Sequence, residues 1–216
     1  MSTATTSDLE FVVRTIARTA VENERAFSDL DAVVGDGDLG YSLARGFEIV
    51  LADWDSFDRD TPSDFLKKIA LVISKRVGGT SGPLWGTAFL RAAGAISDRS
   101  ELTALTGEDA VAMLRAAAEG IKKRGRSDLG DKTLLDALIP MTDALEKALG
   151  GGGDGADLSA VVAESARAAA EATTPMQAMR GRPSYTGERS IGSPDAGAMA
   201  VAVMAERVAD EWPAHV

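Results

Sequence analysis

Apolar side chains recur at intervals of three and four residues through nearly the whole chain, and this spacing constrains the fold more than any other feature. Between residues 8 and 28 the apolar positions fall on one face, with charged side chains between them. This is the period of an amphipathic helix. The same period predicts seven further helices, at residues 43–51, 65–77, 84–96, 110–121, 134–149, 158–172 and 196–212. Sustained period-2 alternation, the mark of a half-buried strand, is missing from the sequence. We therefore expect an all-α fold of eight helices.

Several residues at the expected helix ends suit those positions. Thr106, before "GEDA", and Asp157, before "LSAV", are candidate N-caps, and Pro83 suits a first helical position. The Gly-rich stretch "GGGGDGAD" at 150–157 has the composition of a flexible connection. We read it as a loop between the sixth and seventh helices, and we expect a single domain over residues 1–216.

Composition excludes several classes of function. The 216 residues include no cysteine, which removes disulfides, thiolate catalysis and zinc–thiolate sites. A net charge of −10 and a pI near 4.7 leave no basic surface for nucleic acid. No apolar run approaches the roughly 18 to 20 residues that a membrane span needs, and no secretory signal opens the chain. These features predict a cytoplasmic protein that binds neither membrane nor nucleic acid.

A few isolated residues have structural explanations. The only histidine, His215, is next to the C-terminus, where we expect a solvated tail, so histidine-based catalysis or metal binding is not predicted. Methionine and tryptophan residues at helical spacing are expected in the core. They are Met176, Met179, Met199, Met204, Trp85 and Trp212.

Four polar, glycine-rich loops separate the expected helices. They cover residues 30–42, 78–87, 125–133 and 181–198. Each one connects an odd-numbered helix to the next even-numbered one. If the helices alternate up and down, all four loops lie at the same end of the bundle. The pattern therefore predicts one composite site there.

The first of these loops, "LDAVVGDGDLGYS", carries three carboxylates, on Asp31, Asp36 and Asp38. Three carboxylates within eight residues suit Mg²⁺, which takes a few carboxylates and completes its shell with water and phosphate oxygens. The spacing does not fit an EF-hand, because Tyr41 stands where that loop needs glycine. Turn chemistry alone is the alternative reading, since Asp and Gly both favour tight turns.

The second loop, "GGTSGP", brings the Thr80 and Ser81 hydroxyls to a helix start, where backbone N–H groups bind anions. A simple helix-connecting turn is the alternative. In the fourth loop, Arg182 could pair with a phosphate or form a loop salt bridge. Asp195 could cap the last helix, with Gly197 allowing close backbone packing.

Four segments of the sequence together resemble a known family. "LDAVVGDGDLG", "VGGTSGPLWGTAFLRAA", "LGDKTLLDALIP" and "MQAMRGRPSYTGERSIGSPDAGA" look like the motif blocks of the nucleotide-binding L subunit of dihydroxyacetone kinases. The four blocks occur in the family's order and cover nearly the whole chain. This resemblance is much more specific than any single loop.

The resemblance implies an eight-helix antiparallel up-and-down barrel that holds ATP or ADP with two Mg²⁺ ions at one end. It assigns Asp31, Asp36 and Asp38 as metal ligands. It also assigns positions that line the nucleotide, namely Leu39, Gly40, Tyr41, Ser42, Thr80, Ser81, Gly125, Leu134, Arg182, Asp195, Ala196 and Gly197.

The resemblance further implies that a separate K subunit, similar to DhaK, holds the sugar through a histidine. The chain departs from the family pattern at Leu39 and Ser193, where that pattern has histidine, and at Ala196, where it has proline. The sugar can therefore be dihydroxyacetone, a tetrose or another ketose. Two alternatives to a direct kinase subunit stay open. One is a coenzyme subunit with tightly held ADP, served by a phosphocarrier of the phosphotransferase system, and the other is a non-catalytic nucleotide-binding regulator.

Overall fold

A computed structural model describes residues 7–152 and 155–215, and every regular element in those ranges is helical. Nine α-helices occur there: α1 Asp8–Glu22, α2 Glu24–Asp31, α3 Leu39–Ala52, α4 Pro62–Arg76, α5 Ser81–Ala95, α6 Gly107–Gly125, α7 Leu135–Leu149, α8 Gly155–Glu171 and α9 Ala196–His215. Three short 3₁₀ segments complete the list: η1 Trp54–Ser56, η2 Leu102–Ala104 and η3 Arg182–Ser190. The all-α expectation is confirmed.

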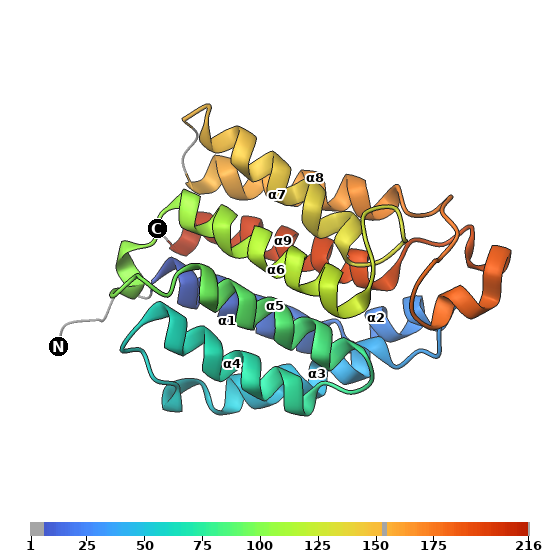
Figure 1. Cartoon of the computed structure of the whole chain (residues 1–216), viewed down its shortest axis with the longest axis horizontal. Helices are drawn as coiled ribbons and strands as arrows, with labels where there is room; N and C mark the ends of the chain where they lie inside the picture. Colours follow the sequence, from blue (N-terminus) through green and yellow to red (C-terminus); the bar gives the residue numbers. More distant parts are fainter. Residues whose placement is uncertain (1–6, 153–154, 216) are drawn as a thin grey trace.

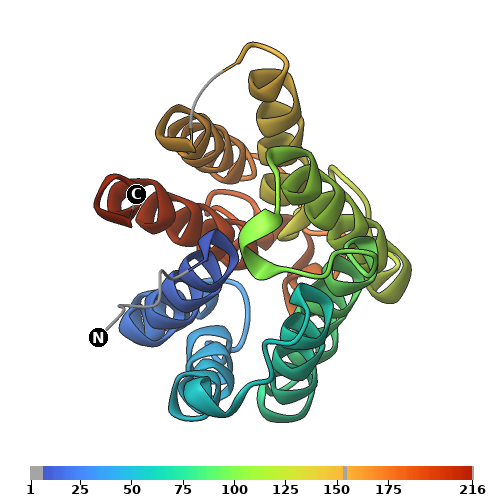
Figure 2. The ribbon, with the colours of Figure 1, turned by 90° about the vertical axis from the view of Figure 1, so that its left-hand side faces the viewer.

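The helices run up and down and close into a ring. From α3 to α9 each helix packs on the next one along the chain, and α1 packs on both α3 and α9. Figure 1 shows the helices lying side by side, and Figure 2 shows the same arrangement seen from the end. The predicted antiparallel up-and-down architecture is therefore confirmed. None of the helices in residues 7–152 and 155–215 is long and apolar enough to cross a membrane.

The first expected helix, at 8–28, is two helices in the structure. The backbone leaves the helical conformation at Asn23, with φ −102° and ψ 16°. The Asn23 amide Nδ2 donates to the carbonyl oxygen of Thr19 at 2.9 Å, a local bond of the kind that competes with helix continuation. Phe27, beyond the break, is still buried. The apolar period thus continues across a break that it does not reveal.

The predicted helix starts have mixed outcomes. Thr106 is the N-cap of α6, and its hydroxyl accepts from the N–H of Asp109 in a capping box, as expected. The predictions for Asp157 as an N-cap and for Pro83 as a first helical residue were wrong. Helix α8 begins at Gly155 and α5 at Ser81, so each residue lies inside the first turn of its helix. The predicted loop at 150–157 is consequently helical from Gly155, while residues 153 and 154 lie outside the described part of the chain.

The core confirms some of the expected residues and corrects others. Met204 and Trp85 are buried, Met199 packs against the core, and Met176 and Trp212 are partly buried. The prediction for Met179 was wrong, because its side chain is 51% exposed in the connection between α8 and α9.

The solvated tail expected at His215 was also wrong. His215 belongs to the last turn of α9, and only 9% of its side chain is exposed. Its ring stacks on Phe11 at 4.2 Å between centroids, and its Nε2 lies 2.8 Å from Oδ1 of Asp8. The histidine therefore joins α9 to α1.

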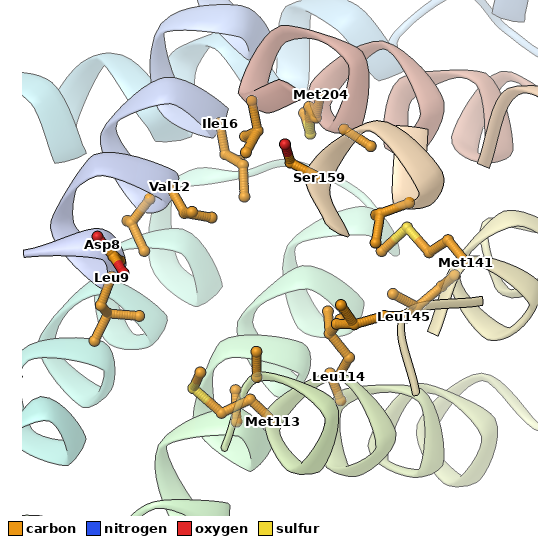
Figure 3. A pocket seen from close by; sticks show the side chains of 18 of the residues that line it. Asp8, Leu9, Val12, Ile16, Met113, Leu114, Met141, Leu145, Ser159 and Met204 are labelled. Carbon is orange, nitrogen blue, oxygen red and sulfur yellow. The ribbon is translucent and has the colours of Figure 1, made fainter. Parts of the chain in front are cut away.

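The ring encloses an apolar cavity of about 540 Å³. Its walls come from α1 and from α4 to α9, and it extends to Asp8, Leu149 and Gly155, which lie at the helix ends opposite the four polar loops. In Figure 3 the labelled wall residues are apolar except for Asp8 and Ser159. The middle of the ring thus offers few polar groups, and polar chemistry is concentrated at its ends.

Candidate functional site

The four polar connections lie together at one end of the ring, on the right in Figure 1. They join α2 to α3, α4 to α5, α6 to α7 and α8 to α9. The last one contacts two others: Arg182 forms an ion pair with Asp36, and the N–H of Met179 donates to the carbonyl oxygen of Asp131 at 3.0 Å. The predicted gathering of the loops is confirmed.

The structure brings the three predicted metal-binding carboxylates together. Asp31 is the last residue of α2, Asp36 lies in the loop, and Asp38 directly precedes α3. Each offers one oxygen, and the three oxygens lie within 4.8 Å of one another. Like charges this close repel each other, so the cluster favours a cation. Within residues 7–152 and 155–215, this is the one group of acidic residues close enough together to hold a metal ion.

Arg182 supplies positive charge to this cluster. It lies at the start of η3, and its guanidinium pairs with Asp36 and lies 3.9 Å from Asp38. The side chain is 59% exposed, so the pair is accessible to water. The loop salt bridge considered from the sequence therefore exists, and it places the arginine beside the carboxylate cluster.

The start of α5 faces the same carboxylates. Gly79 has φ +59°, a conformation that favours glycine, and a Cβ built there would lie 3.9 Å from Oδ2 of Asp38. Thr80 is the N-cap, yet its hydroxyl makes no capping bond, and Ser81 is the first residue of the helix. The first N–H groups of a helix have no partner within it. This helix start can therefore meet an anion beside the carboxylates.

Residues 39–42 begin α3, and their side chains face different ways. A side chain at Gly40 would overlap the carbonyl oxygen of Glu24, so this glycine permits close packing of α3 on α2. Ser42 is buried and lies near Gly78, whereas Tyr41 is 57% exposed. Leu39 is partly buried, and its N–H lies 3.4 Å from Oδ2 of Asp31. Ser42 thus lies next to the α4–α5 loop, whereas Leu39 turns its backbone N–H to Asp31 and packs its side chain against the core.

The remaining predicted residues lie at the adjoining ends of other helices, and a Cβ on Gly125 would lie 3.3 Å from Leu84 of α5. Gly125 ends α6, Leu134 is the N-cap of α7, and Ala196 begins α9. A Cβ on Gly197 would lie 3.2 Å from Cβ of Leu134, so the starts of α7 and α9 adjoin closely. Asp195 caps α9, as expected, because its Oδ2 accepts from the N–H of Ala198 at 2.8 Å.

The carboxyl group of Asp195 has a raised pKa. Burial, together with the nearby charge of Asp136, raises the pKa of Asp195 to about 7. The bond from Ala198 and the charge of Lys132 act in the opposite direction. A carboxyl group that titrates near neutral pH is common at functional sites.

Residues 33–210 match the family described as DAK2 domain. The chain belongs to the DAK2 domain family. Over 185 residues this DAK2 chain is 38% identical to an Escherichia coli protein named "PEP-dependent dihydroxyacetone kinase, ADP-binding subunit DhaL", covering 83% of the chain and 84% of that protein. It is also 36% identical over 195 residues to the L-erythrulose 1-kinase of Mycolicibacterium smegmatis. That match covers 89% of the chain and 33% of the larger protein.

A solved structure has the same fold as the DAK2 chain. The dihydroxyacetone kinase from C. freundii, in complex with AMP-PNP and Mg²⁺, superposes with a TM-score of 0.69 at 22% identity. The match covers 93% of this chain and 33% of that one.

Two buried charged residues of the DAK2 chain were not predicted from its sequence. Lys132 is 2% exposed and donates to three carbonyl oxygens of the α8–α9 connection. Asp136 is 3% exposed and accepts from the N–H groups of Gly130 at 2.6 Å and Thr133 at 2.7 Å. The only signal was the "GDKT" segment in a glycine-rich loop, and a solvated lysine gives the same pattern.

Proposed function

We propose that the chain is the ATP- or ADP-binding, Mg²⁺-dependent subunit of a ketose kinase of the dihydroxyacetone kinase type. The observation that carries this proposal is the cluster of Asp31, Asp36 and Asp38, whose oxygens lie within 4.8 Å of one another beside the start of α5. Membership of the DAK2 family and the named activities of its relatives support the assignment. We further propose that residues 1–216 act as one nucleotide-binding domain in the cytoplasm, where ATP is supplied.

The three aspartates would hold the magnesium, and we propose two ions. The cluster fits this role, because it already attracts the Arg182 guanidinium and its donors are the hard oxygens that Mg²⁺ prefers. Bound magnesium neutralises phosphate oxygens, which an acidic protein of net charge −10 would otherwise repel.

The surrounding residues would bind and orient the nucleotide. Thr80 and Ser81 offer hydroxyls and backbone N–H groups at the start of α5. Arg182 offers a planar fork of donors that suits a phosphate. The rest of the nucleotide would lie against the other predicted residues at these helix ends, namely Leu39, Gly40, Tyr41, Ser42, Gly125, Leu134, Asp195, Ala196 and Gly197. Phosphoryl transfer depends mainly on such positioning and on charge stabilisation.

The sugar would be held by another chain. His215, the only histidine, lies at the end of the ring opposite the loops, so it cannot hold a ketose beside the nucleotide. The relative from M. smegmatis is about three times longer than the matched part, since the chain covers 33% of it. We therefore propose a DhaK-like sugar-binding partner. The ketose is dihydroxyacetone, a tetrose such as erythrulose, or a related sugar.

The E. coli relative supports a second mode of action, because its name describes it as PEP-dependent and ADP-binding. In this mode the nucleotide stays bound as a coenzyme, and a phosphocarrier of the phosphotransferase system rephosphorylates it. A third candidate, a non-catalytic regulator, would bind nucleotide and transfer nothing.

Nucleotide exchange separates these modes. The purified chain is loaded with labelled Mg·ADP and mixed with a DhaK-like subunit and ketose, with either ATP or PEP and its phosphocarriers as donor. Release of label at every turnover supports the direct kinase, and turnover without release supports the coenzyme mode. We expect no ketose phosphorylation by the chain alone. If the nucleotide does not bind in a Mg²⁺-dependent manner, the proposed function is wrong.

A further inference from the structure

Lys132 is a buried cation that joins two of the four loops. It lies in the connection between α6 and α7 and is 2% exposed. Its Nζ donates to the carbonyl oxygens of Met176 at 3.0 Å, Ser190 at 2.5 Å and Ser193 at 2.8 Å. An ammonium group has three N–H donors, so each donor can serve one of these carbonyls. All three acceptors belong to the connection between α8 and α9.

A buried lysine at this position lowers the stability of the fold unless its ammonium group is compensated. Burial of an ammonium group opposes folding unless hydrogen bonds and opposite charges compensate. Burial lowers the pKa of Lys132, and the nearby Asp195 carboxylate only partly opposes this effect. The backbone of Lys132 is also left-handed, with φ +59°, which few residues other than glycine adopt. These costs are offset because one atom with three diverging donors can bind three separate carbonyls.

The three carbonyls mark the beginning and the end of a long segment that contains η3. Residues 176–193 fold back on themselves, and the N–H of Ala178 donates to Oγ of Ser190 at 2.9 Å. The segment carries Arg182, which pairs with Asp36 at the other side of the site. It leads directly into Asp195, the cap of α9. The position of these two residues therefore depends on how the segment is held.

We propose that Lys132 is a positioning residue for the nucleotide site. Its ammonium holds residues 176–193 against the α6–α7 connection, and this keeps Arg182 opposite Asp36 and Asp195 beside the start of α7. The assignment rests on the proposed function for the identity of the ligand, whereas the holding of the segment can be tested without any ligand.

The absence of cysteine from the sequence allows a test with matched side chains. In a Lys132→Cys variant, the single thiolate is alkylated in denaturant and the chain is then refolded. With 2-bromoethylamine, a C–S bond replaces the C–Br bond and bromide leaves, which gives a lysine analogue with sulfur in place of Cγ. With 1-bromopropane the product has the same length but ends in a methyl group. The two products differ only in the terminal donor and its charge.

Trypsin sensitivity without nucleotide is the first measurement. Arg180 and Arg189 both lie in the segment and are exposed, so cleavage after them reports its opening. We expect the propyl form to be cut at these sites about tenfold faster than the aminoethyl form, with unchanged helical circular dichroism. The variant Lys123→Met, at an exposed position of α6, is the control and should be cut like the wild type.

Affinity for Mg·ADP is the second measurement. Loss of a side chain that orients the residues of a metal site typically lowers the affinity of that site about 10- to 100-fold. We expect such a loss for the propyl form and recovery in the aminoethyl form. Equal cleavage and equal affinity of the two forms would overturn the proposal. If the alkylated chains do not refold, the variants Lys132→Arg and Lys132→Met replace them. Equal resistance of these two variants to trypsin would also overturn the proposal. If the wild type itself binds no Mg·ADP, the proposed function fails, while the trypsin comparison still decides the role of Lys132.

Discussion

The guanidinium of Arg182 forms an ion pair with Asp36, although the two residues lie in connections at opposite ends of the sequence. The same guanidinium lies 3.9 Å from Asp38. An arginine in this position can neutralise the carboxylates when no cation is bound. When magnesium neutralises them instead, the arginine can pair with a phosphate. Exposure of its side chain leaves it free to make this exchange.

Replacing Arg182 tests this exchange. We expect Arg182→Ala to weaken Mg·ADP binding about 10- to 100-fold, because a hydrogen bond to a charged group contributes about 1.5–3 kcal/mol. Arg189→Ala, an exposed position in the same segment, is the matched control. Isothermal titration calorimetry measures both. Wild-type affinity in Arg182→Ala would limit this residue to a loop salt bridge.

Neutralising one aspartate of the cluster should abolish Mg²⁺-dependent nucleotide binding. We expect this for Asp36→Asn and for Asp38→Asn, because each removes an anionic ligand from a three-carboxylate site. The metal-free variants should keep their helical circular dichroism and change in unfolding free energy by less than about 1 kcal/mol, since the lost ion pairs are exposed. Asp55→Asn, at an exposed position of η1, serves as control. Unchanged affinity for Mg·ATP in either variant would move the metal elsewhere.

Two threonines at helix starts should respond in opposite ways. Thr80 makes no capping bond with its hydroxyl, so Thr80→Ala should leave the unfolding free energy nearly unchanged but weaken Mg·ADP binding. The hydroxyl of Thr106 caps α6 at the other end of the ring, so Thr106→Ala should lose about 1 kcal/mol of stability and bind nucleotide normally. Urea unfolding and titration calorimetry on both variants give the comparison. Identical behaviour of the two would remove Thr80 from the site.

Asp195 should make stability depend on pH. Its pKa is raised from 3.8 to about 7 in the folded chain, so the folded state keeps a proton that the unfolded chain has lost. Its contribution to the unfolding free energy is therefore fully present below about pH 4 and is lost as the pH rises to 7. The loss is up to about 4 kcal/mol, or three pKa units at about 1.4 kcal/mol each, and less where water reaches the carboxylate.

The variant Asp195→Asn isolates this effect, because its amide oxygen can still cap α9 without titrating. The difference in unfolding free energy between Asp195→Asn and the wild type should rise in favour of the variant between pH 4 and pH 7. Carboxyl groups that do not interact with Asp195 cancel in this difference. A difference that stays constant over this range would show that Asp195 titrates normally.

Periodicity could predict the helices because it records which side chains face the core. The last helix was expected at 196–212 and is observed at Ala196–His215, and the sixth was expected at 134–149 and is observed at Leu135–Leu149. The break at Asn23 could not be predicted, because Phe27 keeps its place on the buried face beyond it. The helix break is invisible in the sequence because the apolar spacing continues on both sides of it.

The three clustered aspartates are close together in the sequence, whereas the contacts of Lys132 and His215 join distant segments. Asp31, Asp36 and Asp38 share one loop, so their meeting needs no knowledge of the tertiary fold. The acceptors of Lys132 are 44 to 61 residues away. The contact between His215 and Asp8 spans 207 residues. Neither contact could be inferred until the path of the whole chain was known.

The closed ring also has a consequence for how the chain folds. Most neighbouring helices in the ring are neighbours in the sequence, whereas α1 and α9 meet from the two ends of the described chain. Local contacts form quickly because they close short loops, and distant ones carry a larger entropic cost. We therefore expect pairs such as α4 and α5 to assemble first and α9 to dock on α1 last. Trp212, which packs edge-on against Phe11 at 5.6 Å between ring centroids, would report that closing step through its fluorescence.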